Sequence, residues 1–330
     1  MSKFIGEIAG AVKSELSSAR FTSRNLHHLS SGRVFWVIKT TKTNYAAFVK
    51  DHPAYQSADG VVTVAAVYNT VDDAIGACTA GQGDIIYVCE GHTETVTATS
   101  IAHDVAGISV IGLGSGQNRP TFTFGAAAAT ITVSGANGTW KNCRFVANFL
   151  DVASAFTLGA AKGFTLEGNS FTETSSSLNF LSIVTTGSTD NDADDLVVRG
   201  NFWQGLNTTP LAFISILAAE KGLLIENNDV FLDATSGGEF ITLSSKIISG
   251  ARIRNNRHIV VGATGTTTGI FLTGSGTTSK GLVSDNFVAS LDTTTELLFT
   301  AGTGLVYFRN EYTGVADKSG YILPAIDSAA

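Results

Sequence analysis

Apolar residues recur in short runs along most of this chain. Between about residues 107 and 312, segments such as "GFTLEGNSF" (163–171) and "GLLIENNDV" (222–230) return at regular intervals. Each apolar run spans three to five residues, is rich in Val, Ile, Leu and Phe, and is bounded by Gly, Asn, Ser or Thr. Runs of this length and composition favour β-strands over helices.

An Asn closes most of these runs. The equivalent positions are Cys143, Asn169, Asn201, Asn228, Asn256, Asn286 and Asn310, at successive intervals of 26, 32, 27, 28, 30 and 24 residues. This spacing predicts a solenoid of stacked units. Asn tolerates left-handed backbone angles and bonds nearby main chain, so we expect these side chains to stack at a turn between two strands, with the aromatic residue two positions later in the core. The alternative is a series of isolated Asn turns.

A second series of runs keeps the same period. Its central residues are Thr132, Thr157, Ser182, Ser215, Thr242, Phe271 and Leu298, at intervals of 25, 25, 33, 27, 29 and 27 residues. Because side chains alternate along a strand, the central hydroxyls are expected to face solvent. At Phe271 and Leu298 the outward position becomes apolar. This indicates either a surface covered by segment 320–330 or by another subunit, or scattered surface hydrophobes.

A unit of about 27 residues suits three short strands and three turns, and one such unit cannot bury its own apolar face. Stacked units can, by bonding each strand to its counterpart one rung away. The prediction is therefore an all-β, single-stranded, right-handed parallel β-helix, since parallel crossovers are right-handed in nearly all proteins. We assign residues 68–312 to the β-helix and 313–330 to a C-terminal tail or cap.

Residues 1–67 lack the repeat, and we assign them to an N-terminal anchor and docking segment. An apolar stripe of Phe4, Ile5, Ile8, Val12 and Leu16 predicts an amphipathic helix that docks on a partner. In "YNTVDDAIGAC" (68–78), Thr70 and Asp73 form a capping box for a short helix near 70–78. We expect this helix to close the first rung, since solenoid ends need a cap.

The composition limits the classes of partner that the chain could bind. The 330 residues carry a net charge of −7, a pI of about 5.3 and only 15% charged residues. This balance argues against nucleic acid, which would require clustered Lys and Arg. The longest apolar runs are too short for a membrane helix of about 20 residues. Cys78, Cys89 and Cys143 match neither a redox nor a zinc motif, so they are interpreted as buried thiols of a protein made in a reducing cytosol.

The candidate chemistry is sparse. In "DNDADD" (190–195) the acids are spaced as in a calcium loop, but Asp195 stands at the Gly position and Asn201 at the bidentate Glu position. A solvated turn insertion explains the segment better. The remaining acids do not pair as glycosidase chemistry requires, and the six histidines lack ligand spacing. The sequence thus predicts no catalytic, cofactor or metal residues.

Several motifs resemble a family of tailed-bacteriophage β-helix proteins. They are "GRVFWV" (32–37), "GDIIYVCEGHTET" (83–95), "GLGSGQNRPTFTF" (112–124) and "NCRFVANFLD" (142–151), and the likeness extends over about residues 32 to 326. The resemblance implies a virion-associated protein with a pectate-lyase-like, right-handed fold, and it brings no catalytic motif. The chain departs from this pattern at 37–62, which lacks an Asn-, Gly- and Pro-rich loop.

We therefore expect a non-enzymatic structural protein of the virion, made in the bacterial cytoplasm. The expected form is a homotrimer that decorates or cements the capsid or its vertices. Its partners would be other copies, the major capsid protein or other virion proteins, and a host surface glycan in addition. The alternative is a tailspike-type adhesin that binds or depolymerises a polysaccharide. A cellular β-helix carbohydrate enzyme is a third class, but its usual dense catalytic set is missing.

Overall fold

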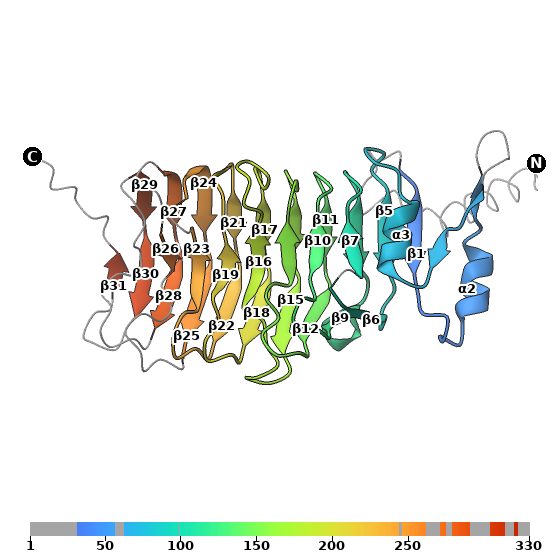
Figure 1. Cartoon of the computed structure of the whole chain (residues 1–330), viewed down its shortest axis with the longest axis horizontal. Helices are drawn as coiled ribbons and strands as arrows, with labels where there is room; N and C mark the ends of the chain where they lie inside the picture. The colour runs from blue at the N-terminus through green and yellow to red at the C-terminus, as the bar shows by residue number, and fades with distance from the viewer. Residues whose placement is uncertain are drawn as a thin grey trace, which may run out of the picture.

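The computed structural model describes residues 32–56, 63–98, 100–243, 246–261, 271–274, 279–290, 304–313 and 320–322. Over these residues the chain winds into a parallel β-helix, which confirms the predicted fold class (Figure 1). Successive turns stack along the long axis of the molecule from the blue N-terminal end to the red C-terminal end. Each full turn adds one strand to each of three sheets.

The sheets hold 12, 10 and 7 strands within the described residues. The first contains β4 (Val67–Tyr68), β1 (Val34–Val37), β5 (Ile85–Val88), β8 (Ser109–Gly112), β11 (Thr139–Lys141), β14 (Thr165–Glu167), β17 (Val197–Arg199), β21 (Leu224–Glu226), β24 (Ile248–Arg254), β27 (Lys280–Ser284) and β29 (Leu305–Phe308), with β20 (Glu220–Lys221) beside β24. The second contains β6 (Thr93–Val96), β9 (Thr121–Phe124), β12 (Arg144–Ala147), β15 (Ser170–Glu173), β18 (Phe202–Gly205), β22 (Asp229–Leu232), β25 (Arg257–Val260), β28 (Phe287–Ser290), β30 (Asn310–Thr313) and β31 (Gly320–Ile322). The third contains β7 (Ile101–His103), β10 (Ile131–Val133), β13 (Phe156–Leu158), β16 (Ser182–Thr186), β19 (Ala212–Ser215), β23 (Glu239–Thr242) and β26 (Leu272–Thr273).

A tight turn joins the first sheet to the second in each rung, and the Asn residues stack there. In successive rungs, the Oδ1 atom of each Asn accepts the backbone N–H and the Nδ2–H of the Asn one rung before, at 2.8–3.2 Å. Each Nδ2 also donates to a carbonyl of the preceding first-sheet strand, as from Asn228 to Val198 at 2.9 Å. The column consists of Asn169, Asn201, Asn228, Asn256, Asn286 and Asn310, all at most 2% exposed. These are the positions that the spacing predicts.

The expected left-handed backbone lies one residue earlier than predicted. The residues with positive φ are Asn142, Gly168, Gly200, Asn227, Asn255, Asp285 and Arg309, with φ between 48° and 63°. They precede the column and turn the chain, which leaves the column Asn free to point inward. The prediction that the column Asn itself adopts these angles was therefore wrong.

Aromatic side chains fill the interior beneath this column. Phe145 stacks on Phe122 and Phe171, with ring centroids 5.5 and 5.0 Å apart. Phe145, Phe171 and Trp203 each follow the column position by two residues and are fully buried, as the sequence predicts. His258 occupies the same slot, fully buried, with its ring 5.7 Å from that of Phe240.

The third sheet has a different register from the one expected. Thr157 pairs with Thr185, and Thr242 pairs with Thr273, so these threonines form the outward hydroxyl row in place of Ser182 and Phe271. Ser182 is 1% exposed, and Phe271 is fully buried with its ring stacked 4.5 Å from Phe240. The prediction that Phe271 faces outward was wrong, because Phe271 directly precedes β26, where two consecutive residues, Phe271 and Leu272, are buried like Phe240 and Ile241 one rung before. Leu298 lies outside the described residues.

Helix α3 (Val71–Ala77) closes the N-terminal end of the β-helix. The Thr70 side chain accepts the N–H of Asp73 and donates to the Asp73 carboxylate, so Thr70 is the N-cap that the sequence predicts. The Asp72 carboxylate accepts the N–H of Ala102 on β7, the first strand of the third sheet, at 2.9 Å. The helix thereby covers an open sheet edge.

The first sheet includes a strand that precedes residue 68, because β1 pairs in parallel with β5. Before α3, helix α2 (Tyr45–Asp51) packs near β1 through Phe48 and Trp36, whose rings lie 5.5 Å apart, and β2 (Tyr55–Gln56) pairs with β3 (Thr63–Val64). A 3₁₀ turn, η1 (Gly116–Asn118), follows β8. The predicted stripe from Phe4 to Leu16 lies outside the described residues.

At the other end, β31 pairs antiparallel with β30 and covers that edge of the second sheet. It belongs to the segment assigned to a C-terminal tail or cap. No helix in the described ranges is long and apolar enough to span a bilayer.

We predict that Asn228→Ala lowers the free energy of unfolding by about 2–4 kcal/mol, because it leaves buried donors and acceptors of two neighbouring rungs without partners. Urea denaturation followed by circular dichroism would measure this. The matched control is Asn227→Gly, which changes the adjacent exposed residue at φ 56° and should be neutral or slightly stabilising. Equal losses in both variants would contradict a special role for the column.

Candidate functional site

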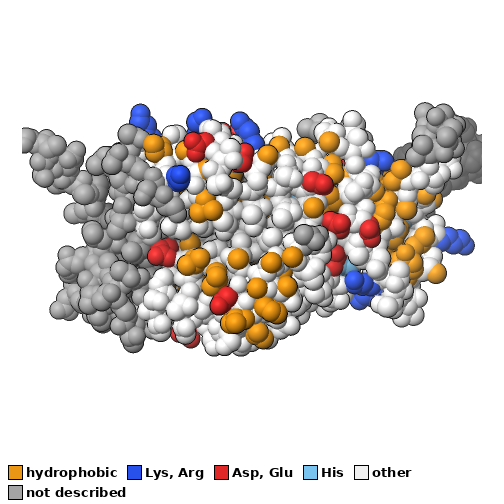
Figure 2. All heavy atoms as spheres, viewed as in Figure 1, with side chains coloured by type: hydrophobic (Ala, Val, Ile, Leu, Met, Phe, Trp, Pro, Cys, Tyr) orange, Lys and Arg blue, Asp and Glu red, His pale blue; other side chains and the backbone are white. Residues whose placement is uncertain are grey.

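The outer face of the second sheet changes character along the molecule. On β6 and β9 it presents Thr93, Thr95, Thr121 and Thr123. From β18 to β28 it presents mainly Phe202, Phe231, Ile259 and Phe287, and Val261 follows β25. We call this second region, with these five apolar residues, the aromatic face. Figure 2 shows hydrophobic side chains gathered where Figure 1 places β18, β22 and β25.

Rings and ion-paired charges are interleaved on the aromatic face. The Phe202 and Phe231 rings lie 5.9 Å apart, and Phe202 is 37% exposed. The Arg257 guanidinium lies 4.4 Å from the centre of the Phe231 ring, and its Nε is 3.0 Å from Asp229 Oδ1. Such a cation–π contact contributes about 0.5–1 kcal/mol at an exposed site. The charges on this part of the face therefore neutralise each other.

Two hollows open on this side of the molecule. The first, of about 350 Å³, lies over β18, β22 and β25. Its polar side chains are Gln204 and Asp233, and its other lining residues are Gly205, Leu206, Phe231, Leu232, Ile259 and Val261. An apolar floor with a few polar groups at its rim is typical of ligand sites.

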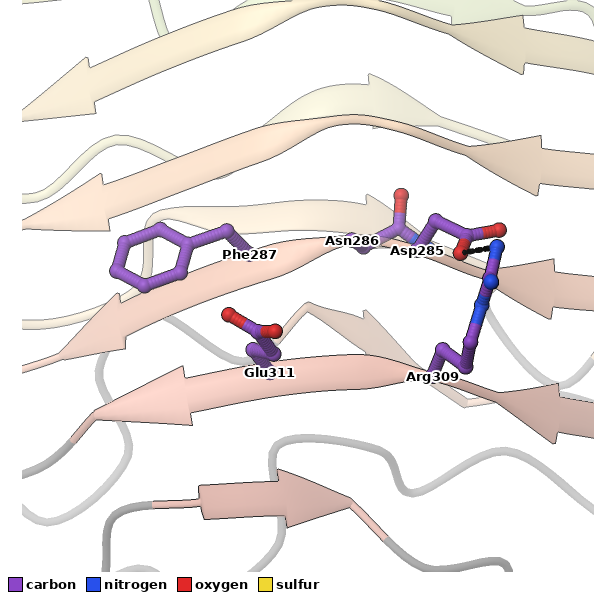
Figure 3. A pocket seen from close by; sticks show the side chains of 5 residues that line it. All are labelled: Asp285, Asn286, Phe287, Arg309 and Glu311. Atoms are coloured by element: carbon purple, nitrogen blue, oxygen red, sulfur yellow. Dashed lines mark ion pairs between the residues drawn. The ribbon is translucent and has the colours of Figure 1, made fainter.

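The second hollow, of about 360 Å³, lies at the last rungs and is lined by Asp285, Asn286, Phe287, Arg309 and Glu311 (Figure 3). Arg309 forms an ion pair with Asp285. In the close-up, the Glu311 side chain points from β30 toward β28, which carries Phe287. Asn286 belongs to the buried column, so only the other four side chains are available to a ligand.

The buried acidic side chains accept hydrogen bonds from backbone N–H groups. Glu173 accepts the N–H groups of Phe180, Leu206 and Asn207 at 2.6–3.1 Å, which ties two loops to the second sheet. Desolvation raises the pKa of Glu173 to about 7, although these N–H groups act in the opposite direction. Glu220 is 1% exposed, and burial raises its pKa to about 7 as well.

Burial suppresses the acid–base chemistry of His103 and the thiolate chemistry of Cys143. His103 Nδ1 accepts the Trp140 indole N–H at 2.9 Å, and burial lowers the pKa of His103 to about 4. Desolvation raises the pKa of Cys143 to about 12, which suppresses the reactive thiolate. Within the described ranges, no three His, Cys, Asp or Glu side chains converge on a point where a metal ion could bind.

Among the residues singled out from sequence, the acidic segment 190–195 lies at the turn between the third and first sheets. It lies at a different turn of the rung from the aromatic face on the second sheet, which sequence reasoning missed. A signal exists nonetheless: Phe202 and Phe287 directly follow column residues Asn201 and Asn286, and strand alternation sends such positions outward.

No family model matches the chain, and no curated protein matches it. Among solved structures, a rhamnogalacturonan lyase is similar over 88% of this chain and 90% of its own, with 11% identity and a TM-score of 0.33. A Geobacillus virus E2 protein, ORF18, is similar over 82% of this chain and 60% of its own, with 13% identity and a TM-score of 0.28. The resemblance to phage virion β-helix proteins stays a prediction.

We predict that the free energy of unfolding falls as pH rises from 5 to 8. Glu173 and Glu220 have folded-state pKa values of about 7, above the value of about 4.3 in unfolded chains. A group with a raised folded-state pKa stabilises the fold below its unfolded pKa, and this contribution is lost as pH rises through the folded pKa. Urea unfolding at pH 5 and pH 8 measures the difference.

The variant Glu173→Gln should be less stable at both pH values, because its amide NH₂ would face a backbone N–H that now meets a carboxylate oxygen. Between pH 5 and pH 8, however, its free energy of unfolding should fall by less than that of the wild type. An unchanged difference would mean that Glu173 titrates near its ordinary pKa.

Proposed function

We propose that this protein is a non-enzymatic structural component of a tailed-phage virion. In this proposal the N-terminal segment anchors the chain to the capsid or another virion protein, and the β-helix projects outward as part of a homotrimer. Two observations support the proposal: the β-helix fold and the sequence resemblance to tailed-phage β-helix proteins. The major capsid protein and other copies of the chain are the proposed partners.

The non-enzymatic part of the proposal rests on one observation. Acidic and basic side chains form ion pairs between neighbouring rungs of the first sheet. On the first sheet, Glu167 accepts hydrogen bonds from Lys141 and Arg199, each at 2.7 Å, and Glu226 pairs with Arg254 at 2.8 Å. Desolvation raises the pKa of Glu167, but these two bonds outweigh it and hold the pKa below its ordinary value. A general acid needs the opposite shift. These carboxylates are suited to joining neighbouring strands.

The buried acids support the same interpretation. Glu173 and Glu220, whose pKa values lie near 7, point into the protein and bond backbone N–H groups. Hydrolysis of a glycosidic bond requires two carboxyl groups facing each other across an accessible groove. The described acids favour a rigid, passive surface over a reaction centre.

The test is the location of the protein on particles. Antibodies against the purified chain should label intact particles of the phage whose genome encodes it, by immunogold electron microscopy. A variant without residues 2–19 should keep its circular dichroism spectrum and melting temperature but be lost from purified particles. A full chain that is absent from particles would overturn the proposal.

The predicted stripe can be tested by single substitutions in the full-length chain. Ile8→Asp lies on the apolar stripe and should reduce particle association at least tenfold. Lys13→Gln lies off the stripe and is the matched control. Equal retention of both variants would place the anchor elsewhere in the chain.

A second candidate function is a tailspike-type adhesin, which the aromatic face favours. Its rings and two hollows could hold the apolar faces and hydroxyl groups of a polysaccharide. Incubating the purified protein with host capsular polysaccharide or lipopolysaccharide and assaying for released oligosaccharides distinguishes the candidates. Release that is lost in Asp192→Asn or Asp194→Asn would favour a depolymerase over the structural role.

A further inference from the structure

Glu220 occupies a core position at the turn between the third and first sheets. In the two-residue strand β20, it pairs with Ile248 on β24. On the other side, the N–H of Ala193 in the preceding rung reaches its side chain. Ala193 and Ile248 are fully buried, so a carboxyl group stands in a column where its neighbours are apolar.

The two oxygens of this carboxyl group have different surroundings. Oε2 accepts the Ala193 N–H at 3.0 Å. Oε1 is buried and has no hydrogen-bond partner among the described residues. A buried, ionised carboxylate with a bare oxygen is costly, and such a group normally takes up a compensating positive charge or a proton.

The nearby charges make ionisation harder. Asp190, Asp192 and Asp194, all on the insertion 187–196, act electrostatically on Glu220. Asp190 accepts the N–H of Ala219 at 2.9 Å and Asp194 that of Lys221 at 2.8 Å, which holds two of these acids in place around it. Burial, and to a smaller extent these carboxylates, raise the pKa of Glu220, although the Ala193 N–H acts in the opposite direction.

Among the described residues, Glu220 forms no ion pair with a Lys or Arg, and Lys221, which follows it in β20, is exposed. Lys162, on the preceding turn, lies 4.0 Å from Asp194 and 3.9 Å from Asp195, and its side chain is 61% exposed. The residue that β24 pairs with Glu220 is Ile248, which carries no charge. The acids of this turn therefore outnumber the two lysines, Lys162 and Lys221, that lie at it.

We propose that Glu220 holds a proton taken from solvent in the folded protein, and that this proton couples pH to the docking of the insertion 187–196. With the proton present, the neutral carboxyl group keeps its bond to Ala193 beside three aspartates. When the proton leaves, a fourth negative charge repels the insertion, and the turn opens locally.

The direction of the effect follows from linkage. The closed turn holds the proton up to about pH 7, whereas an opened, hydrated Glu220 would lose it above about pH 4.3. The opening equilibrium should thus rise by up to about tenfold per pH unit between these values and level off above pH 7. The effect is local and does not depend on the proposed virion role.

Hydrogen–deuterium exchange of the intact protein tests this. Peptides covering 187–196 should lose at least tenfold in protection between pH 5 and pH 8, after correction for the intrinsic pH dependence of exchange. Glu220→Gln keeps an oxygen for the Ala193 N–H and cannot ionise, so its protection should change less than twofold. The control Glu311→Gln changes an exposed acid and should behave as wild type.

Two results would overturn the proposal. One is a pH profile of the insertion that is the same in wild type and Glu220→Gln. The other is protection at pH 8 that 1 mM Ca²⁺ restores and EGTA removes, because the compensating charge would then be a metal ion. Loss of folding in Glu220→Gln would be visible by circular dichroism, and Glu220→Met then provides a second neutral side chain for the same comparison.

Discussion

The structure depends on the satisfaction of buried backbone groups at one repeated turn. Where the first sheet passes into the second, the chain turns sharply and buries main-chain N–H and C=O groups that no strand can pair. The Asn column solves this in every rung from Asn169 to Asn310, since one side chain both accepts from and donates to its neighbours. Because the same bond repeats, each rung fixes the height and register of the next, and the stacked core follows.

This dependence explains how much the sequence could reveal. The column could be recognised in the sequence because six successive rungs place Asn at this turn, at intervals of 24 to 32 residues that vary with the length of the loops. The third sheet has no such marker. "FLSIVTT" contains Ser182, Thr185 and Thr186, and alternation alone permits more than one register. Packing of the aromatic rings decides it, as for Phe271 against Phe240, and packing is not visible in one sequence.

The candidate surfaces were harder to foresee for a related reason. Phe202 and Trp203 are neighbours in sequence, yet one faces solvent and the other the core. Glu220 resembles any surface acid until the register places it beside Ile248 and Ala193. Both features depend on how rungs align, so they emerge only once the three sheets are assembled. The paired charges of the first sheet and the apolar face of the second divide the molecule into surfaces of different character.

The antiparallel course of β31 has a consequence for assembly. A β-helix with a bare final rung offers a template on which another molecule could continue the same winding, and chains could then add head to tail without limit. Here the last strand of the second sheet is covered by one that runs the opposite way, while α3 bonds to the starting edge of the third. Each termination therefore protects the edge of one sheet against the addition of a further strand.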